Sequence, residues 1–595
     1  METQFQKLIS DSEHIIKKRT PVFNAIGYLK AALVLLFTLG VIFQFVKGFS
    51  LPLVFLCTVL LIVLAALWVY HDKLHKALNL NKGVLEINRR HHDRLSSRWN
   101  EVFDGGDEFF SADHPYAMDL DIVGKKSLFQ YINTTHTWYG RRAFAESLLD
   151  PAYSIEELLQ RQKAIEELSE DIGFHNALEY RFSQFGTDKS IEKLVKELKD
   201  KHVFTKSGLF RFIVSYMPIL TILAIAATIL LKNPYFYLAS AALLSLQGLI
   251  WLGGLLKTSK YLGSTAGMPY KLSFFSDIIQ LMQNRSFKSV KLISFQKKLC
   301  SSGLSAFRAF NELGKISDRI NIRSNGILLF LFNVLFLWDY GCALMLEKWK
   351  MKYADMSEQW FMILGELESL MSFAIMPHIC ANTCLPEILK EGKMIKAENL
   401  GHPLLPNETR VNNDMNLNDS IFIISGSNMS GKTTFLRTVG INLVLAQAGG
   451  FVCADSMAFT PFSIITSMRI SDDLNEGVST YYAELKRIKK IIELAKDDRN
   501  MIFLIDEIFK GTNSVDRLIG ARTVIEKLDL LGAIGLITTH DLALCELANE
   551  HLRVLNYSFS EQFSDNTISF DYLLRQGRST STNAKFLMKM VGIIE

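Results

Sequence analysis

A glycine-bounded loop constrains this chain more than any other feature. An apolar run, 421–425, precedes the loop and a helix-forming run, 435–448, follows it. The two glycines let the backbone turn and bring its N–H groups close to phosphate oxygens, at the positive end of the helix. The lysine can reach the β- and γ-phosphates of a nucleotide, and the first threonine can coordinate Mg²⁺. The loop therefore predicts an α/β domain that binds ATP. Its residues are Gly426, Ser427, Asn428, Met429, Ser430, Gly431, Lys432, Thr433 and Thr434.

Two further apolar runs end in side chains that suit phosphate chemistry. One ends in Asp506 and Glu507, and the other leads to His540. Asp506 suits Mg²⁺ coordination, and Glu507 can orient or deprotonate the attacking water. His540 can sense the γ-phosphate, although a single histidine is more often structural. The sequence therefore predicts Mg²⁺-dependent ATP hydrolysis. The candidate catalytic residues are Lys432, Glu507 and His540, and the candidate metal ligands are Thr433 and Asp506.

The composition adds a membrane component. Hydrophobic residues make up 49% of the 595 residues and charged residues only 21%, which is an apolar balance for a soluble ATPase. Two apolar runs, 25–46 and 51–70, are joined by a short turn, and 212–231 with 235–256 repeat the pattern. The run 51–70 carries no charge and would span about 30 Å as a helix, the thickness of a bilayer core. We expect two transmembrane hairpins. Buried core helices are the alternative, and a signal peptide is disfavoured by the length of the first run.

Basic residues flank both hairpins and predict their orientation. They are typical of the cytoplasmic side, so we expect a multi-pass protein of the inner or plasma membrane with its ATPase domain in the cytoplasm. A fifth apolar run, 327–338, is too short to span a bilayer and is expected to be a core helix. The flanking residues are Lys17, Lys18, Arg19, Lys73, Lys76, Lys206, Arg211, Lys257 and Lys260.

The nucleotide motifs occur with a further segment, Asp472-Asp-Leu-x-x-Gly-x-Ser479-Thr480, whose glycine and hydroxyls open a helix. Together with Asp506-Glu-Ile-x-x-Gly-Thr-x-Ser-x-Asp516 and Thr539-His540, this set resembles the MutS family of DNA mismatch-repair ATPases. The segment 127–165 is similar to the start of the MutS lever domain. The resemblance covers about 115–200 and 300–595, and it adds Ser479, Thr480 and Asp516 to the ATP-binding residues.

The resemblance implies a fold class and a domain order. We expect an α/β P-loop ATPase domain of the ABC type at the C-terminus, preceded by an all-α core and lever region that carries two transmembrane helical hairpins. The expected segments are a cytoplasmic N-terminal segment (1–24), hairpin one (25–70), a MutS-like helical core (71–205), hairpin two (206–260), the continuation of the lever and core (261–395) and the ATPase domain (396–595).

The resemblance also implies partners. A helix start such as Ser479-Thr480 is an anion site, and in face-to-face dimers it completes the site of the partner, so we expect a homodimer. Membrane lipid and duplex DNA are the other expected partners. We find no amino-terminal mismatch-reading domain with a Phe-x-Glu wedge in the sequence, so we expect phosphate contacts without mismatch reading. The candidate DNA contacts, for which solvated helix faces are the alternative, are Arg89, Arg90, Arg94, Arg285, Lys288 and Lys291.

Two other functions fit parts of the sequence. A membrane-bound scaffold that switches an unknown protein partner with ATP would need no nucleic acid. An ABC-type transporter would use the hairpins, but they offer few charged residues to line a polar route, and Gly477-Val-Ser-Thr480 differs from the transporter signature. The net charge of +4 does not decide for or against nucleic acid.

Overall fold

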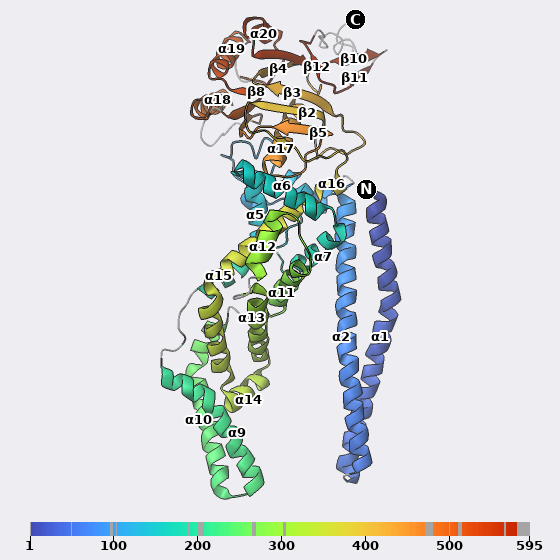
Figure 1. The fold of residues 1–595 in the computed structure, drawn as a ribbon, viewed down its shortest axis with the longest axis vertical. Coiled ribbons are helices and arrows are strands. Elements are labelled where there is room, and N and C mark those ends of the chain that lie inside the picture. Colours follow the sequence, from blue (N-terminus) through green and yellow to red (C-terminus); the bar gives the residue numbers. More distant parts are fainter. Residues whose placement is uncertain are drawn as a thin grey trace.

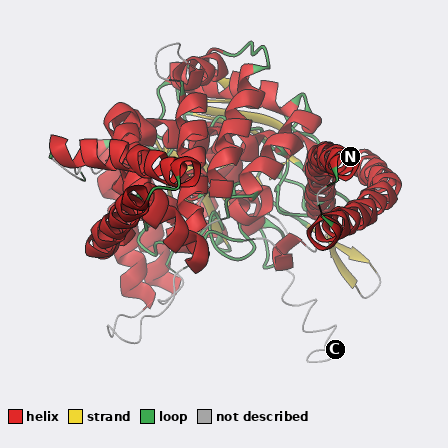
Figure 2. Ribbon diagram, turned by 90° about the horizontal axis from the view of Figure 1, so that it is seen from below, coloured by secondary structure: helices red, strands yellow, loops and turns green. Residues whose placement is uncertain are grey.

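The computed structural model describes residues 2–48, 50–95, 99–102, 104–186, 190–199, 204, 207–263, 269–300, 305–469, 480–498, 500–509, 514–564 and 567–579. An α/β domain forms one end of the molecule, and a helical region extends from it toward the other end (Figure 1). Two helical hairpins stand apart from each other along that region (Figures 1 and 2). The turns of both hairpins lie at the end of the molecule away from the α/β domain.

Hairpin 1 consists of α1 (Glu2–Lys47) and α2 (Leu51–Arg94). The helix α1 continues through residues 2–24 without a break. Gly48 has a φ of 92°, which suits a glycine at the turn, and Pro52 lies in the first turn of α2, where a missing N–H is tolerated. Apolar side chains in the halves of both helices next to the turn are exposed. Examples are Leu35 at 60% exposure and Phe55 at 72%.

Hairpin 2 consists of α9 (Gly208–Leu231) and α10 (Pro234–Leu262). Ser207 and Asn233 cap the helices with their side chains. The four hairpin helices and α15 (Trp338–Ala374) are long and apolar enough to cross a membrane. The apolar window of α15 is 83% buried inside the protein, so α15 is the spine of the helical region rather than an outer helix.

The prediction of a core helix at 327–338 is wrong. This segment forms α14 (Gly326–Phe336), a helix whose apolar side chains are largely exposed. Ile327 is 73% exposed and Phe330 is 55% exposed, and Asn333 is the buried member of the helix. The short length of the run suggested a core helix, but length does not determine what covers a helix.

The helical region packs around α15. Its α6 (Ile155–Ser169) begins with a capping box, in which Ser154 accepts from the N–H of Glu157 and the Glu157 carboxylate accepts from the N–H of Ser154. Glu368 of α15 accepts hydrogen bonds from the N–H groups of His136 and Thr137, which ties α5 to the spine. The remaining elements are α3 (Trp99–Val102), η1 (Asp107–Phe109), α4 (Leu128–Ile132), α5 (Trp138–Leu149), α6 (Ile155–Ser169), α7 (Ile172–Ser183), α8 (Ser190–Lys199), α11 (Pro269–Gln283), α12 (Val290–Cys300), α13 (Ala306–Asn321), η2 (Ile322–Ser324) and α16 (Met376–Ile379).

The α/β domain is built on a six-stranded sheet of order β12-β9-β4-β8-β7-β6. The strands from β9 to β6 are parallel, and β12 is antiparallel to β9. A four-stranded sheet of order β1-β5-β2-β3 and the hairpin β10-β11 complete it. The strands are β1 (Glu387–Ile388), β2 (Met394–Leu400), β3 (Asn413–Asn418), β4 (Ile421–Ser425), β5 (Ser456–Phe459), β6 (Ser463–Ser467), β7 (Met501–Asp506), β8 (Ile534–Thr539), β9 (Val554–Ser558), β10 (Glu561–Ser564), β11 (Thr567–Phe570) and β12 (Arg575–Gln576), and the helices are α17 (Lys432–Gln447), α18 (Thr480–Asp497), α19 (Ser514–Leu530), η3 (Leu542–Glu546) and α20 (Leu547–Glu550).

The α/β domain and the helical region share a continuous core. A Cβ atom on Gly450 would lie 2.8 Å from the ring of Phe373, so only glycine allows this close approach to α15. Asp119 accepts hydrogen bonds from the hydroxyl of Thr466 at 2.6 Å and from the N–H of Arg469 at 2.9 Å. These contacts fix the end of β6 against the helical region. The α/β domain and the helical region are therefore joined by hydrogen bonds as well as by their shared core.

Candidate nucleotide site

The phosphate loop lies at the carboxyl edge of the parallel sheet. It connects β4 to α17, and β4 pairs in parallel with β8 and β9, so the ends of these strands meet at one edge. Gly426 and Gly431 have φ values of 151° and 104°, which favour glycine. A Cβ atom on Gly426 would lie 2.9 Å from the carbonyl oxygen of Phe559. Both glycines are therefore required by the turn and by its close neighbours.

The Lys432 ammonium group lies inside the loop. The side chain is 5% exposed, and Nζ donates to the carbonyl oxygens of Gly426 at 2.8 Å and Ser427 at 2.7 Å. Nζ also lies 3.5 Å from Nε2 of His540. The ammonium group thus lies at the N-terminus of α17, where it can reach an anion bound by the loop.

The two candidate metal ligands meet directly. The Thr433 hydroxyl lies 3.0 Å from each carboxylate oxygen of Asp506. Asp506 also accepts from the hydroxyl of Thr538 at 2.7 Å, because β7 and β8 pair with Asp506 opposite Thr538. A hydroxyl and a carboxylate are hard oxygen ligands of the kind that Mg²⁺ prefers, so the residues fit this ion.

Glu507 is held in an uncommon backbone conformation. Its φ is 54°, and its N–H donates to the Thr538 hydroxyl at 3.0 Å. Its carboxylate pairs with Nε2 of His540. A left-handed glutamate costs free energy and persists where its surroundings fix it, as at catalytic sites. The geometry holds Glu507 and His540 together at the end of the strands, next to Lys432.

A cleft of about 360 Å³ opens beside the loop. Some of the residues that line it were not predicted from the sequence. Asn413 anchors one wall, because its amide donates to the carbonyl oxygen of Tyr572 at 3.0 Å. Tyr572 packs over Gly431, where a Cβ atom would lie 3.1 Å from the ring. No motif marks Tyr572, because it reaches the cleft from a distant part of the chain. The apolar and aromatic lining residues are Leu400, Leu405, Val411, Phe435, Phe559 and Tyr572.

The other predicted site residues are placed less fully. Asn428, Met429, Ser430, Thr434 and Glu507 line the cleft together with Gly431, Lys432 and Thr433. Ser479 lies outside the described residues, and Thr480 is the first residue of α18, with a side chain outside the description. Asp516 lies in the first turn of α19 and is exposed.

The candidate DNA contacts are largely engaged within the chain. Arg94 is 3% exposed and lies inside the helical region. The prediction that Arg94 contacts DNA is therefore wrong. Arg89 pairs with Glu13 at 2.7 Å. In the same way, Arg285 pairs with Asp171, Lys291 with Glu366 and Arg90 with Glu86. These four side chains are therefore paired with carboxylates of the chain itself.

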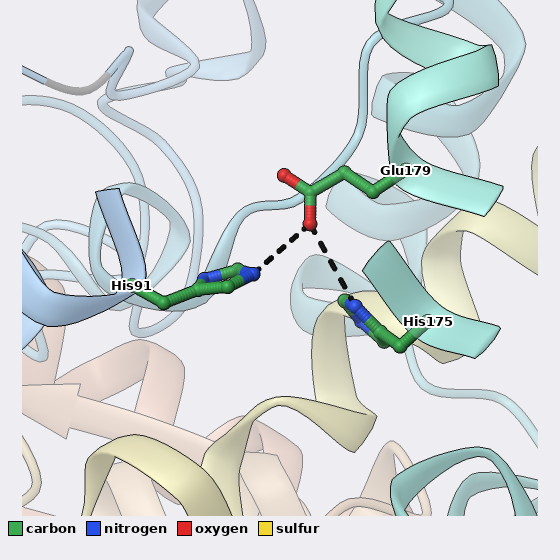
Figure 3. A group of neighbouring side chains, drawn as sticks. All are labelled: His91, His175 and Glu179. Carbon is green, nitrogen blue, oxygen red and sulfur yellow. Dashed lines mark ion pairs between the residues drawn. The ribbon is translucent and has the colours of Figure 1, made fainter. Parts of the chain in front are cut away.

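A second cluster of ligand-type side chains joins hairpin 1 to the helical region. Figure 3 shows His91 of α2 and His175 of α7 pointing at Glu179, at 3.1 Å and 3.7 Å from its Oε2 atom. All three are buried. Arg94 contacts Nδ1 of His91, and because arginine can only donate, a neutral His91 carries its proton on Nε2, the atom that faces Glu179. The arrangement therefore fits a buried charge network better than a metal site.

Burial and neighbouring charge control the titration of this cluster. Burial lowers the pKa of His91 to about 4. Burial alone would raise the pKa of Glu179, but His91 and His136 outweigh it and hold that pKa well below its usual value. Glu179 is thus ionised inside the protein beside a buried arginine, and it links the base of hairpin 1 to α7.

Comparison with known proteins agrees with the motifs. Residues 422–593 match the family model for MutS domain V, and residues 115–250 match that for MutS domain III. The chain is 26% identical over 524 residues to the DNA mismatch repair protein MutS of Aquifex pyrophilus, covering 80% of this chain and 59% of that protein. It is 32% identical over 242 residues to the DNA mismatch repair protein MutS 2 of Halobacterium salinarum, covering 39% of this chain and 27% of the relative.

The matched lengths limit what these relatives say about the whole protein, because the chain spans between about a quarter and three fifths of their length. The two family models together cover the α/β domain from β4 onward and the part of the helical region between residues 115 and 250. On this evidence, the chain belongs to the MutS family.

Proposed function

We propose that this protein is a membrane-anchored MutS-type ATPase that binds ATP with Mg²⁺ and hydrolyses it. The observation that carries the proposal is the meeting of Lys432, Thr433, Asp506 and Glu507 at one edge of the parallel sheet. Lys432 can leave the loop carbonyls for the β- and γ-phosphates. Thr433 and Asp506 would hold Mg²⁺, which neutralises charge on the phosphates.

Glu507 is the proposed general base. His540 and the Thr538 hydroxyl fix its position, so it can orient a water molecule for attack on the γ-phosphate or accept its proton. The aromatic and apolar side of the cleft, with Tyr572 and Val411, offers a surface for the adenine ring. His540 lies between Glu507 and Lys432 and can respond to the γ-phosphate.

Two variants separate binding from turnover. Lys432→Ala should abolish nucleotide binding or turnover, whereas Glu507→Gln should bind ATP and lose hydrolysis. Lys527→Ala, on the exposed face of α19, is the matched control and should keep both. Fluorescent-nucleotide binding and phosphate release on the detergent-purified chain measure the two steps. Full turnover in both site variants would refute the assignment.

We propose that hairpins 1 and 2 anchor the protein in the inner or plasma membrane, with the ATPase domain in the cytoplasm. Their exposed apolar faces, their basic flanks and the common position of their turns support this topology (Figure 1). Cysteines introduced as Ser50→Cys or Asn233→Cys should react with an impermeant maleimide from outside the cell. Ser111→Cys should react only after the membrane is opened, and the reverse pattern would contradict the topology.

The proposed nucleic-acid activity is phosphate-driven binding of duplex DNA, in a repair-related role and without mismatch reading. Such binding should weaken steeply with added salt, because lysine and arginine contacts release counterions. Titrating the solubilised protein with matched and G·T-mismatched duplexes at two salt concentrations tests this. A preference above about tenfold for the mismatch, or about 1.4 kcal/mol, would reveal a reading element.

A second candidate is an ATP-switched scaffold for a protein partner. The internal pairing of Arg89, Arg285 and Lys291 favours it, because these cations are already neutralised. The scaffold predicts an ATPase rate that is unchanged by duplex DNA, whereas the DNA-linked function predicts that the rate responds.

A further inference from the structure

The short helix α14 exposes an apolar face without a protein cover in the described part of the chain. Its sequence, Gly-Ile-Leu-Leu-Phe-Leu-Phe-Asn-Val-Leu-Phe, has one polar side chain. Ile327, Phe330 and Leu331 are 73%, 55% and 45% exposed. Phe330 also contacts α10 of hairpin 2, because its ring lies 6.1 Å from the ring of Trp251 in an edge-on arrangement. The exposed face is therefore continuous with the outer surface of hairpin 2.

The contacts with α10 show how far α14 reaches along hairpin 2. A Cβ atom on Gly248 would lie 3.9 Å from Cγ2 of Val334, near the end of α14. Gly248 lies nine residues before Lys257, the first charge after the apolar run of α10. At 1.5 Å per residue this is about 14 Å, close to half of a bilayer core of about 30 Å. The end of α14 is thus level with the middle of the apolar run.

The chain enters and leaves this position from the same end of hairpin 2. Before α14, the Arg323 guanidinium contacts the hydroxyl of Ser259, which lies between Lys257 and Lys260. After α14, the hydroxyl of Tyr340 donates to the carbonyl oxygen of Ile250 at 3.2 Å. Further along α15, Glu347 pairs with Arg211 at the start of α9, at 2.7 Å. The segment from Arg323 to Glu347 therefore runs along α10 away from the basic flank of hairpin 2 and then returns to that flank.

Polar groups on this path are satisfied locally, as a low-dielectric environment requires. The Asn325 side chain caps the first turn of α14 by accepting from the N–H of Ile327 at 3.0 Å. At the other end, Asn333 accepts from the N–H of Asp339 at 2.9 Å, across the turn at Leu337. The Gln247 amide, in the orientation that satisfies both of its ends, donates to the carbonyl oxygen of Val334 at 3.0 Å.

The one buried charge at the turn is also paired. Asp339 is 0% exposed, accepts from the Trp251 indole at 3.3 Å and pairs with Arg323 at 3.4 Å. The Arg323 guanidinium thus contacts both Ser259, at the basic flank, and the carboxylate of Asp339. A paired acid of this kind is compatible with membrane depth, where an unpaired acid would be costly.

We propose that residues 323–347 form a re-entrant element, in which α14 enters the cytoplasmic half of the bilayer beside hairpin 2 and the start of α15 returns from it. The face formed by Ile327, Phe330 and Leu331 then contacts lipid acyl chains. This inference rests on the proposed membrane anchoring by hairpin 2 and adds a lipid-binding surface at the junction between that hairpin and α15. Since α15 runs on to the α/β domain, the element connects the cytoplasmic leaflet to the ATPase.

Site-specific photocrosslinking to lipid tests the element. The photoreactive residue p-benzoylphenylalanine replaces Phe330 in the full chain, which is then reconstituted in phosphatidylcholine nanodiscs and irradiated. Replacement of Leu249, 66% exposed on α10, is the positive control for hairpin 2. Replacement of Met362, 59% exposed on the distal part of α15, is the negative control. Mass spectrometry of tryptic peptides detects the added lipid, and size-exclusion chromatography checks that each chain is folded.

The expected result is a lipid adduct at positions 330 and 249 and none at 362. An adduct at 249 without one at 330 would overturn the re-entrant element and leave the anchoring by hairpin 2 intact. Absence of adducts at both positions would overturn the anchoring together with the inference. Crosslinks from 330 to protein alone would assign the exposed face to a docked chain and would also overturn the proposal.

Discussion

The hydroxyl of Thr433 lies 3.0 Å from both carboxylate oxygens of Asp506. The fold therefore places the two candidate metal ligands next to each other. Changing Asp506→Asn removes the negative ligand but keeps the shape. We expect hydrolysis to fall by at least about 100-fold and the Mg²⁺ requirement to shift to higher concentration, because a neutral amide binds a hard cation weakly. A Mg²⁺ titration of phosphate release measures both, with Asp497→Asn as the control. An unchanged Mg²⁺ curve would exclude Asp506 as a ligand.

A mixing experiment tests the predicted homodimer with shared sites. Lys432→Ala chains carry a defective loop, and Ser479→Arg chains carry a defective helix start for the partner site. If the sites are composite, a heterodimer of the two keeps about one working site, and mixing should restore part of the activity. Mixed samples that hydrolyse ATP no faster than either parent would show that the sites are not shared in this way.

The buried charge network at the base of hairpin 1 should contribute strongly to stability. Glu179→Ala leaves the buried Arg94 and three histidines, His91, His136 and His175, without their acid, so we expect a loss of about 3 kcal/mol in the free energy of unfolding. The exposed Glu170→Ala should change it by less than about 0.5 kcal/mol. Thermal unfolding in detergent compares the two variants. Addition of EDTA to the nucleotide-free chain should leave its unfolding temperature unchanged, and a drop that is absent in the Glu179→Ala variant would indicate a metal ion in the cluster.

Glu368 should make the stability fall with rising pH. Burial raises its pKa to about 7 from a usual value of 4.5, despite hydrogen bonds from Thr137 and His136. As pH rises between these values, the unfolded chain releases the proton before the folded chain does, so the free energy of unfolding decreases and then levels above the folded pKa. The upper limit of this effect is on the order of 3 kcal/mol.

Denaturant unfolding at several pH values tests this titration. Glu368→Gln cannot ionise and should show a flatter profile between pH 4.5 and 7. Glu312→Gln, exposed on α13, should keep the wild-type slope. A wild-type slope in the Glu368→Gln profile would show that other groups cause the pH dependence.

Most of the phosphate side of the site could be predicted from the sequence. The glycines, Lys432, Thr433, Asp506 and Glu507 lie next to strand ends in the sequence, and parallel strands bring their ends together. Local spacing is therefore sufficient to place them. The adenine side could not be predicted in the same way, because Tyr572 reaches the cleft through long-range contacts with Asn413 and Gly431.

The helical region shows the limit of apolar patterns. A run of apolar residues predicts a helix, as at α9, α10 and α14, but it does not say what covers the helix. The segment 327–338 looked like a core helix from its length, whereas in the structure Gln247 and Gly248 hold it on the outside of hairpin 2. Basic residues mislead in a similar way, since Arg94 is buried among partners that are distant in the sequence.

The most direct test of a membrane-anchored ATPase is to float proteoliposomes of the full chain on a density gradient after a carbonate wash and to measure ATP hydrolysis across the fractions. We expect ATP hydrolysis to be found in the floating lipid fractions. It should be lost from the same fractions when the liposomes carry the Glu507→Gln variant. Protein and activity that stay at the bottom of the gradient, or equal hydrolysis by the variant in the lipid fractions, would contradict it.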